Sequence, residues 1–161
     1  MNPTQISAIV AEHVRLAHLE PPDWTATLAT MTADCFKEHS SIGLRCEGPI
    51  AVRNYYADFF GAFPTLGMEP RNRAFGPNTM VNWGILRLTM ERGWMGMAAT
   101  RRTAALPCVT VIELRDAQVV GETMYYDSIS FCDQLGLVHA EVLAAGRASS
   151  VTNVTSANEG R

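Results

Sequence analysis

Asp127 is the side chain in this sequence best suited to acid–base chemistry. Alternation along a predicted strand at residues 119–127 places Tyr125 and Asp127 on one face and Tyr126 on the other. We expect that face to be concave, so that the carboxylate is partly desolvated among aromatic rings and its pKa rises toward that of a general base. Such a base removes a proton beside a carbonyl, the first step of an aldol cyclisation or a double-bond shift. The alternative is that Asp127 caps the following turn, because Asp-Ser-Ile-Ser is good capping sequence.

Two further residues are candidates to assist such a base. His39 ends a predicted strand at residues 34–40, where it shares a face with Cys35 and Lys37. A neutral imidazole there could donate to a developing enolate oxygen or carry a proton, and Tyr125 could stabilise the same oxygen. The alternative for His39 is an ordinary surface histidine at a strand end.

Aromatic and flexible apolar side chains predict the walls of a pocket. The candidates for substrate binding are Tyr55, Tyr56, Trp83, Arg87, Trp94 and Met97. Aromatic residues at such positions are more often plain core. The arginine lies inside a strand, so it needs an acidic partner across the sheet or a substrate carboxylate. The loop at residues 93–100 could cover a pocket or lie in a dimer interface.

Composition and motifs exclude several classes of function. Thirteen basic and 16 acidic residues give a net charge of −3, and no basic run suits nucleic acid. No apolar run approaches the length of a membrane helix, and a charged N-terminus argues against a signal peptide, so we expect a cytoplasmic protein. The four cysteines are widely spaced, which predicts buried thiols. The four histidines form no metal-ligand pattern, and no phosphate loop or dinucleotide motif occurs, so we expect no metal and no cofactor.

The order of elements predicts an α+β fold. Apolar spacing indicates helices at residues 4–19 (capped by Thr4), 24–31 (capped by Asp23) and 48–63. Strands are indicated at 34–40, 44–47, 68–75, 80–91, 103–114 and 119–127, with a short turn or helix at 130–136. Helices followed by a meander of strands favour helices packed on one face of a mostly antiparallel sheet. We expect one domain at residues 1–146 and a disordered tail at 147–161.

Three segments resemble the SnoaL-like polyketide cyclase family. They are GPIAVRNYYADFFGAFP at 48–64, VTVIELRD at 109–116, and the ending Tyr125-Tyr126-Asp127 followed by Phe131 and QLGL at 134–137. The resemblance runs from about Ala11 to Leu137. It implies the cone-shaped fold of nuclear transport factor 2 and ketosteroid isomerase, with a pocket between three helices and a curved sheet, and often a homodimer.

The resemblance also implies roles for individual residues. Cyclases of the family carry a catalytic aspartate at the place of Asp127, and often a histidine at the place of His39. Epoxide-hydrolase relatives pair a mid-strand arginine with an aspartate two residues later, whereas Arg87 is followed by Leu88 and Thr89, which argues against epoxide opening.

Two hypotheses of function follow. The first is a cofactor-free enzyme that acts on a hydrophobic, carbonyl-bearing small molecule by cyclisation, isomerisation or dehydration. The second is a non-catalytic module of the same fold that binds an apolar ligand or serves to dimerise. An enzyme needs a base and a donor that converge on one reacting atom, and a binding module needs neither.

Overall fold

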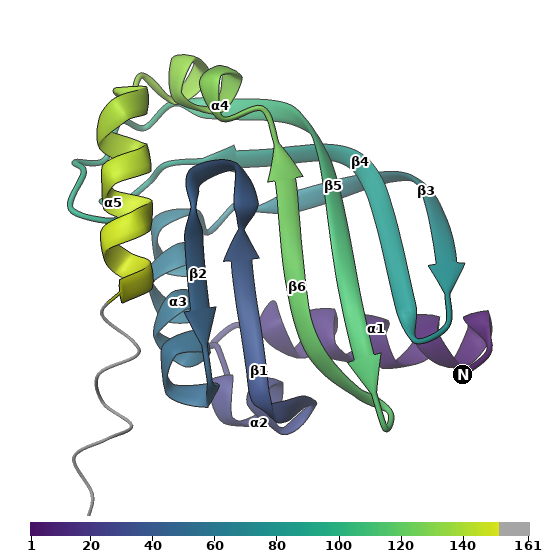
Figure 1. Ribbon diagram of the computed structural model, residues 1–161. Helices are drawn as coiled ribbons and strands as arrows, with labels where there is room; N and C mark the ends of the chain where they lie inside the picture. The colour runs from purple at the N-terminus through teal and green to yellow at the C-terminus, as the bar shows by residue number, and fades with distance from the viewer. Residues whose placement is uncertain (152–161) are drawn as a thin grey trace, which may run out of the picture.

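A single six-stranded sheet forms the centre of the protein, in a computed structural model that describes residues 1–151 (Figure 1). Its strands are β1 (Met31–His39), β2 (Leu44–Glu47), β3 (Gly67–Gly76), β4 (Thr79–Thr89), β5 (Thr103–Arg115) and β6 (Gln118–Tyr126), in the spatial order β2-β1-β6-β5-β4-β3. The helices are α1 (Pro3–Ala17), α2 (Trp24–Ala29), α3 (Pro49–Ala62), α4 (Ser128–Leu135) and α5 (His139–Val151), with one 3-10 turn at Ser40–Ile42. The predicted α+β class with a mostly antiparallel sheet is confirmed.

One strand pair is parallel, and it sets the first strand of the chain beside the last. The pairs β3–β4, β4–β5 and β5–β6 are antiparallel neighbours in sequence, as a meander requires. By contrast, β1 and β6 pair in parallel, with Lys37 opposite Glu122 and His39 opposite Met124. Side chains that are 85 residues apart in sequence therefore stand next to each other on the same face of the sheet.

Helices α1 and α3 cover the concave face of this sheet (Figure 1). The apolar face of α3 supplies Tyr55, Tyr56, Phe59 and Phe63, all buried, and their rings pack on one another and on Trp94. Large aromatic side chains bury the most apolar area per residue and so contribute strongly to a core. Part of the space under α1 is left open and forms the cavity described below.

The helix starts show where capping chemistry was predictable. Asp23 caps α2 as expected, by accepting a hydrogen bond from the Ala26 backbone N–H at 2.9 Å. For α1 the predicted cap, Thr4, is wrong: Asn2 accepts from the Gln5 N–H while the Gln5 side chain accepts from the Asn2 N–H. This reciprocal capping box satisfies two backbone donors, and Pro3 tolerates the first helical position because it has no N–H to satisfy.

The C-terminal helix α5 corrects the predicted tail. Residues 147–151, which were expected to be disordered, continue this helix, whereas 152–161 lie outside the described residues. The Ser150 hydroxyl accepts from the Arg45 backbone N–H at 2.7 Å and donates to the Gly43 carbonyl at 2.9 Å. Helix α5 therefore covers the edge strand β2, whose backbone would otherwise be open to pairing with another chain.

The outer face of the sheet carries exposed aromatic side chains. Trp83, Val109 and Tyr125 lie in one row across β4, β5 and β6 on the face opposite the helices.

Other predictions from the sequence concern the protein as a whole. The homodimer and the cytoplasmic location stay predictions. All four cysteines are buried, as expected. Among residues 1–151 no helix is both long and apolar enough to cross a membrane.

Candidate active site

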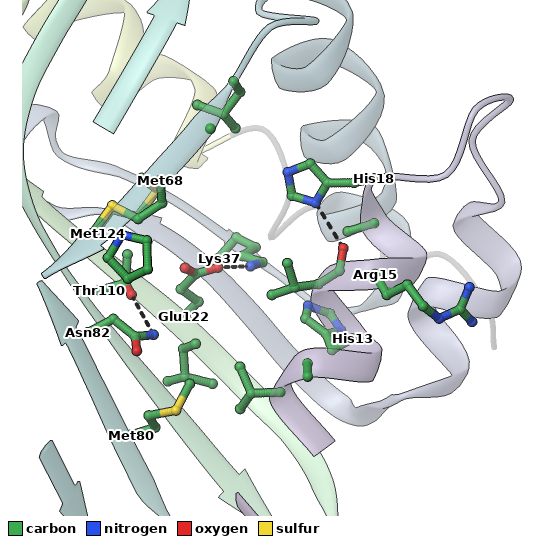
Figure 2. Close-up of a pocket in the computed structure, with 18 of the residues that line it drawn as sticks. His13, Arg15, His18, Lys37, Met68, Met80, Asn82, Thr110, Glu122 and Met124 are labelled. Atoms are coloured by element: carbon green, nitrogen blue, oxygen red, sulfur yellow. Dashed lines mark hydrogen bonds and ion pairs between the residues drawn. The ribbon is translucent and has the colours of Figure 1, made fainter. Parts of the chain in front are cut away.

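A cavity of about 600 Å³ lies between α1, α3 and the concave face of the sheet. Its walls are mostly apolar, with Val10, Phe59, Phe60, Met80, Leu86, Ile112 and Met124 among the lining side chains. The size and lining are those of a small-molecule site. A few polar groups interrupt the apolar wall, and Figure 2 shows how they converge on it from α1 and from four strands.

A buried ion pair between Lys37 and Glu122 lies in the floor of this cavity (Figure 2). Strand pairing sets the two residues directly opposite each other on β1 and β6. The Lys37 side chain is 6% exposed, while the Glu122 side chain is 21% exposed. Since Lys37 donates to one carboxylate oxygen, Oε2, the other oxygen is available to a molecule in the cavity.

Each charge of the pair holds the other ionised. Burial alone would lower the pKa of Lys37, but attraction to Glu122 and contact with Tyr56 raise it well above its ordinary value. Burial would likewise raise the pKa of Glu122, but the ammonium of Lys37 lowers it below its ordinary value. The cavity therefore contains a carboxylate anion and an ammonium cation at neutral pH.

A directed chain of hydrogen bonds extends from Lys37 into α1. Thr30 donates its hydroxyl proton to the Thr27 carbonyl at 2.6 Å, so its oxygen accepts from His13 Nδ1–H at 2.7 Å. The His13 Nε2 atom is then an acceptor, and it takes the Tyr56 hydroxyl proton at 2.9 Å. This leaves the Tyr56 oxygen to accept from Lys37, whose ammonium also lies 5.0 Å from the centre of the Tyr56 ring. The chain of hydrogen bonds holds the Tyr56 hydroxyl and the Lys37 ammonium in place, and Lys37 donates to Glu122.

Two buried histidines are neutral in the folded protein. Burial, with a smaller effect of Lys37, lowers the pKa of His13 to about 3. Burial also lowers the pKa of His39 to about 3; its ring contacts the Tyr55 hydroxyl at 2.5 Å and the Tyr126 hydroxyl at 2.9 Å. Each imidazole acts as a hydrogen-bonding spacer between hydroxyl groups rather than as a cation.

We therefore expect the protein to lose stability in mild acid. Between pH 6.5 and about 3, the unfolded chain binds protons at His13 and His39 that the folded chain does not. The stabilisation that comes from keeping both histidines neutral is complete above pH 6.5. Below that value the free energy of unfolding falls by about 1.4 kcal/mol per pH unit for each histidine. Urea denaturation at pH 7.5, 6.0 and 5.0 measures this slope. A free energy of unfolding that stays constant over this range would show that both imidazoles accept protons in the folded state.

The structure places Asp127 outside the cavity. Its carboxylate is exposed and caps α4, where it accepts from the Ile129 N–H at 2.9 Å and the Ser130 hydroxyl at 2.7 Å. These hydrogen bonds lower its pKa, so the expected rise toward the range of a general base is wrong. The alternative prediction, that Asp127 caps the turn after the strand, agrees with its position at the start of α4. A proton-transfer role for Asp127 stays a prediction, which the experiment proposed below tests.

The other predicted residues divide between the cavity, the core and the outer face. Tyr55 and Tyr56 line the cavity. His39 is buried behind Tyr55 rather than exposed at a strand end, so the surface alternative is wrong. Tyr125, at 46% exposed, lies on the outer face, because Glu122, Met124 and Tyr126 face inward on β6.

Four candidate substrate-binding residues also lie away from the described cavity. Trp83 is on the outer face, and Arg87 pairs there with Glu69 across β3 and β4 at 2.5 Å, as the need for an acidic partner predicted. Trp94 is buried in the aromatic core, and Met97 packs beside it through a short backbone bridge. The loop that contains them is anchored to the core, and neither residue lines the cavity.

The most important polar group of the cavity was not predicted. The sequence pattern puts Lys37 on the same strand face as His39, but it does not single out Glu122. The signal that could have found them is that each charged residue shares a strand face with side chains that become buried: Lys37 with Cys35 and His39, and Glu122 with Met124 and Tyr126. Within the described part of the chain, no group of histidine, cysteine and acidic residues could hold a metal ion.

Comparison with known proteins places this fold in a family. The SnoaL-like domain family matches residues 10–122. A candidate SnoaL-like polyketide cyclase from Jannaschia sp. CCS1 is 22% identical, with a TM-score of 0.70 over 84% of this chain and 95% of that one. TerC, whose crystals contained polyporic acid, is 20% identical, with a TM-score of 0.61 over 82% of this chain and 98% of that one.

A third similar structure has a ketosteroid isomerase-like fold and comes from Catenulispora acidiphila. It was determined with trimethylamine and is 15% identical, with a TM-score of 0.65 over 82% of this chain and 95% of that one. No curated protein matches the chain. Likeness at these identities shows the fold, which is the nuclear transport factor 2-like cone expected from the sequence. Because the family match spans well over half of the sequence, the chain belongs to the SnoaL-like domain family.

Proposed function

We propose that this protein is a cofactor-free enzyme that transfers protons on a hydrophobic, carbonyl-bearing small molecule. Glu122 is the base that removes a proton beside the carbonyl. The observation that carries the proposal is the Lys37–Glu122 pair in the floor of an otherwise apolar cavity of about 600 Å³. The reaction class is aldol cyclisation, isomerisation or dehydration, all of which begin with such a proton transfer.

The ion pair suits this chemistry because the net charge of the site and its bound substrate stays constant while the proton moves from the substrate to Glu122. When Glu122 accepts a proton it becomes neutral, and the negative charge moves to the carbonyl oxygen of the substrate. The ammonium of Lys37 then stabilises the enolate instead of the carboxylate. An apolar cavity disfavours an uncompensated charge strongly, so a cation already in place lowers the barrier without reorganising solvent.

Tyr56 and His13 have supporting roles in this proposal. The Tyr56 hydroxyl lies beside Lys37 and its proton is directed to His13 Nε2. Burial raises the pKa of Tyr56 to about 12, so the phenol stays neutral and can donate a hydrogen bond. Because His13 is anchored by Thr30, it keeps the tyrosine and the lysine in place next to the carboxylate.

The second candidate function is that of a non-catalytic binding protein. A specific observation favours it: Lys37 lowers the pKa of Glu122, which weakens the carboxylate as a base. The pair could then serve only to orient a polar ligand. Relatives of known structure were crystallised with trimethylamine and with polyporic acid, so binding without turnover is compatible with the fold.

Proton exchange in deuterated water separates these functions. We expect the wild-type protein to bind 2-tetralone or another cyclic ketone of a test panel and to exchange its α-protons above the uncatalysed rate, as followed by NMR. Asp127→Asn should exchange equally well, because its carboxylate is exposed and lies outside the cavity. Loss of exchange in Asp127→Asn would instead establish Asp127 as the base. Binding of the ketones without exchange would favour the binding protein.

A further inference from the structure

A second polar position lies on the cavity wall, on β4 and β5. Asn82 and Thr110 are directly opposite each other in the antiparallel register of these strands. Both line the cavity, and Thr110 is only 7% exposed. Figure 2 shows the two side chains facing each other on the sheet, across the floor from His13. Their neighbours Met80, Leu86 and Ile112 are apolar.

The hydrogen bonding of this pair is incomplete. Asn82 Nδ2 donates to Thr110 Oγ1 at a long 3.4 Å, and the buried Asn82 Oδ1 has no partner among the described residues. Since the Thr110 oxygen accepts this bond, its own proton is left to be donated. An unsatisfied buried polar group costs about 1–3 kcal/mol, so the arrangement favours any bound group that completes it.

A hydroxyl group is the ligand group that matches this pair. It donates to the Asn82 oxygen and accepts from the Thr110 hydroxyl, after a small rotation of the amide into the cavity. Turning the amide by 180° exchanges the roles of the two residues but again leaves one donor and one acceptor. A carbonyl or an ether would satisfy only one of them.

We propose that Asn82 and Thr110 form a second polar subsite that binds a hydroxyl group of the substrate, away from the carbon that Glu122 deprotonates. The proposal rests on the proposed function for the choice of ring ketones as probes. The spacing of the strands sets the distance between Glu122 and the subsite. From the Glu122 Cα to the Cα of Thr110 is about 8 Å, and to that of Asn82 about 12 Å, as expected for strands roughly 4.8 Å apart and a shift of two residues. A ketone with a hydroxyl on a second fused ring spans this distance.

Calorimetric titration with matched probes tests the subsite. The probes are 2-tetralone, its 5-, 6- and 7-hydroxy derivatives, and the corresponding methoxy derivatives. We expect the wild-type protein to bind at least one hydroxy derivative about tenfold more tightly than 2-tetralone, and its methoxy counterpart with no such gain. Asn82→Leu and Thr110→Val should each remove the preference while 2-tetralone still binds. Val111→Thr, which makes the reverse exchange of side chains on the outer face of β5 and outside the cavity, should preserve it.

The outcomes separate this inference from the proposed function. Absence of any hydroxyl preference in the wild-type protein, whether or not 2-tetralone binds, would overturn the subsite. So would a preference that survives in both Asn82→Leu and Thr110→Val. A hydroxyl preference without α-proton exchange would support the subsite and reject Glu122 as a working base. Exchange without a hydroxyl preference would support the proposed function and reject the subsite.

Discussion

Glu122→Gln is expected to slow α-proton exchange of a bound ring ketone by about 10²–10⁴-fold, the usual contribution of a general base. The amide has the shape of the carboxylate, and its oxygen still accepts a hydrogen bond from Lys37, so the folded cavity keeps its form. The variant is nevertheless less stable than the wild-type protein, because the buried Lys37 ammonium loses its counter-charge. We therefore expect the dissociation constant of 2-tetralone to change little while the exchange rate falls. NMR exchange rates and calorimetric titration on the same samples measure the two quantities separately.

The matched control is Glu113→Gln, the same substitution at an exposed carboxylate on β5. It should leave both the exchange rate and the affinity unchanged. Because Lys37 lowers the pKa of Glu122, the wild-type rate should be constant at neutral pH and fall only below the ordinary pKa range of a glutamate. Exchange that survives in Glu122→Gln would place the base elsewhere and contradict the proposed mechanism.

Lys37→Met is expected to lower the free energy of unfolding by about 3–5 kcal/mol, because it leaves the Glu122 carboxylate buried without a compensating charge. With the lysine gone, burial raises the pKa of Glu122 above its unfolded value. The folded protein then binds the proton more tightly, so the destabilisation grows as the pH rises above the unfolded pKa and shrinks at low pH. Urea denaturation at pH 7.5 and pH 5.0 measures both effects against the wild-type protein.

The double variant Lys37→Met/Glu122→Leu removes both charges and should recover most of the lost stability, because an apolar pair of similar volume is often as stable as a buried ion pair. Arg45→Met serves as a control on the outer face of the sheet, where a partly exposed arginine pairs with Glu38 and Glu47. It should cost less than about 1 kcal/mol. If Lys37→Met cost no more than Arg45→Met, the Lys37–Glu122 pair would be solvated rather than buried.

Local sequence signals predicted most individual elements of the fold. The spacing of Tyr55, Tyr56, Phe59 and Phe63 indicated α3, since one helical face must bury large apolar side chains. The strand at 44–47 and the Asp23 cap were also correct to the residue, because the 3-10 turn at Ser40–Ile42 ends just before β2 and an aspartate is a strong cap for the helix that follows it. Such signals depend on residues near in sequence.

The boundary between α2 and β1 shows where local signals were insufficient. The expected helix at 24–31 ends at Ala29, and β1 begins at Met31 rather than at residue 34. Pairing with β6 accounts for this, because Met31 lies opposite Val119 in the sheet. Helix α5 was missed for a related reason: its stability depends on contacts with β2 and the turn before it, including the hydrogen bonds of Ser150.

Local periodicity in the sequence indicated the class of fold, and aromatic and flexible apolar side chains indicated an apolar pocket. The family resemblance came from three matching segments, at residues 48–64, 109–116 and 125–137. Which face of β6 looks inward, and so whether Glu122 or Asp127 reaches the cavity, depends on how the helices pack on the sheet. Alternation separates the two faces of a strand but does not say which one the helices cover. The parallel pairing of β1 with β6 then set Lys37 against Glu122, and no local pattern specifies a contact between strands 85 residues apart.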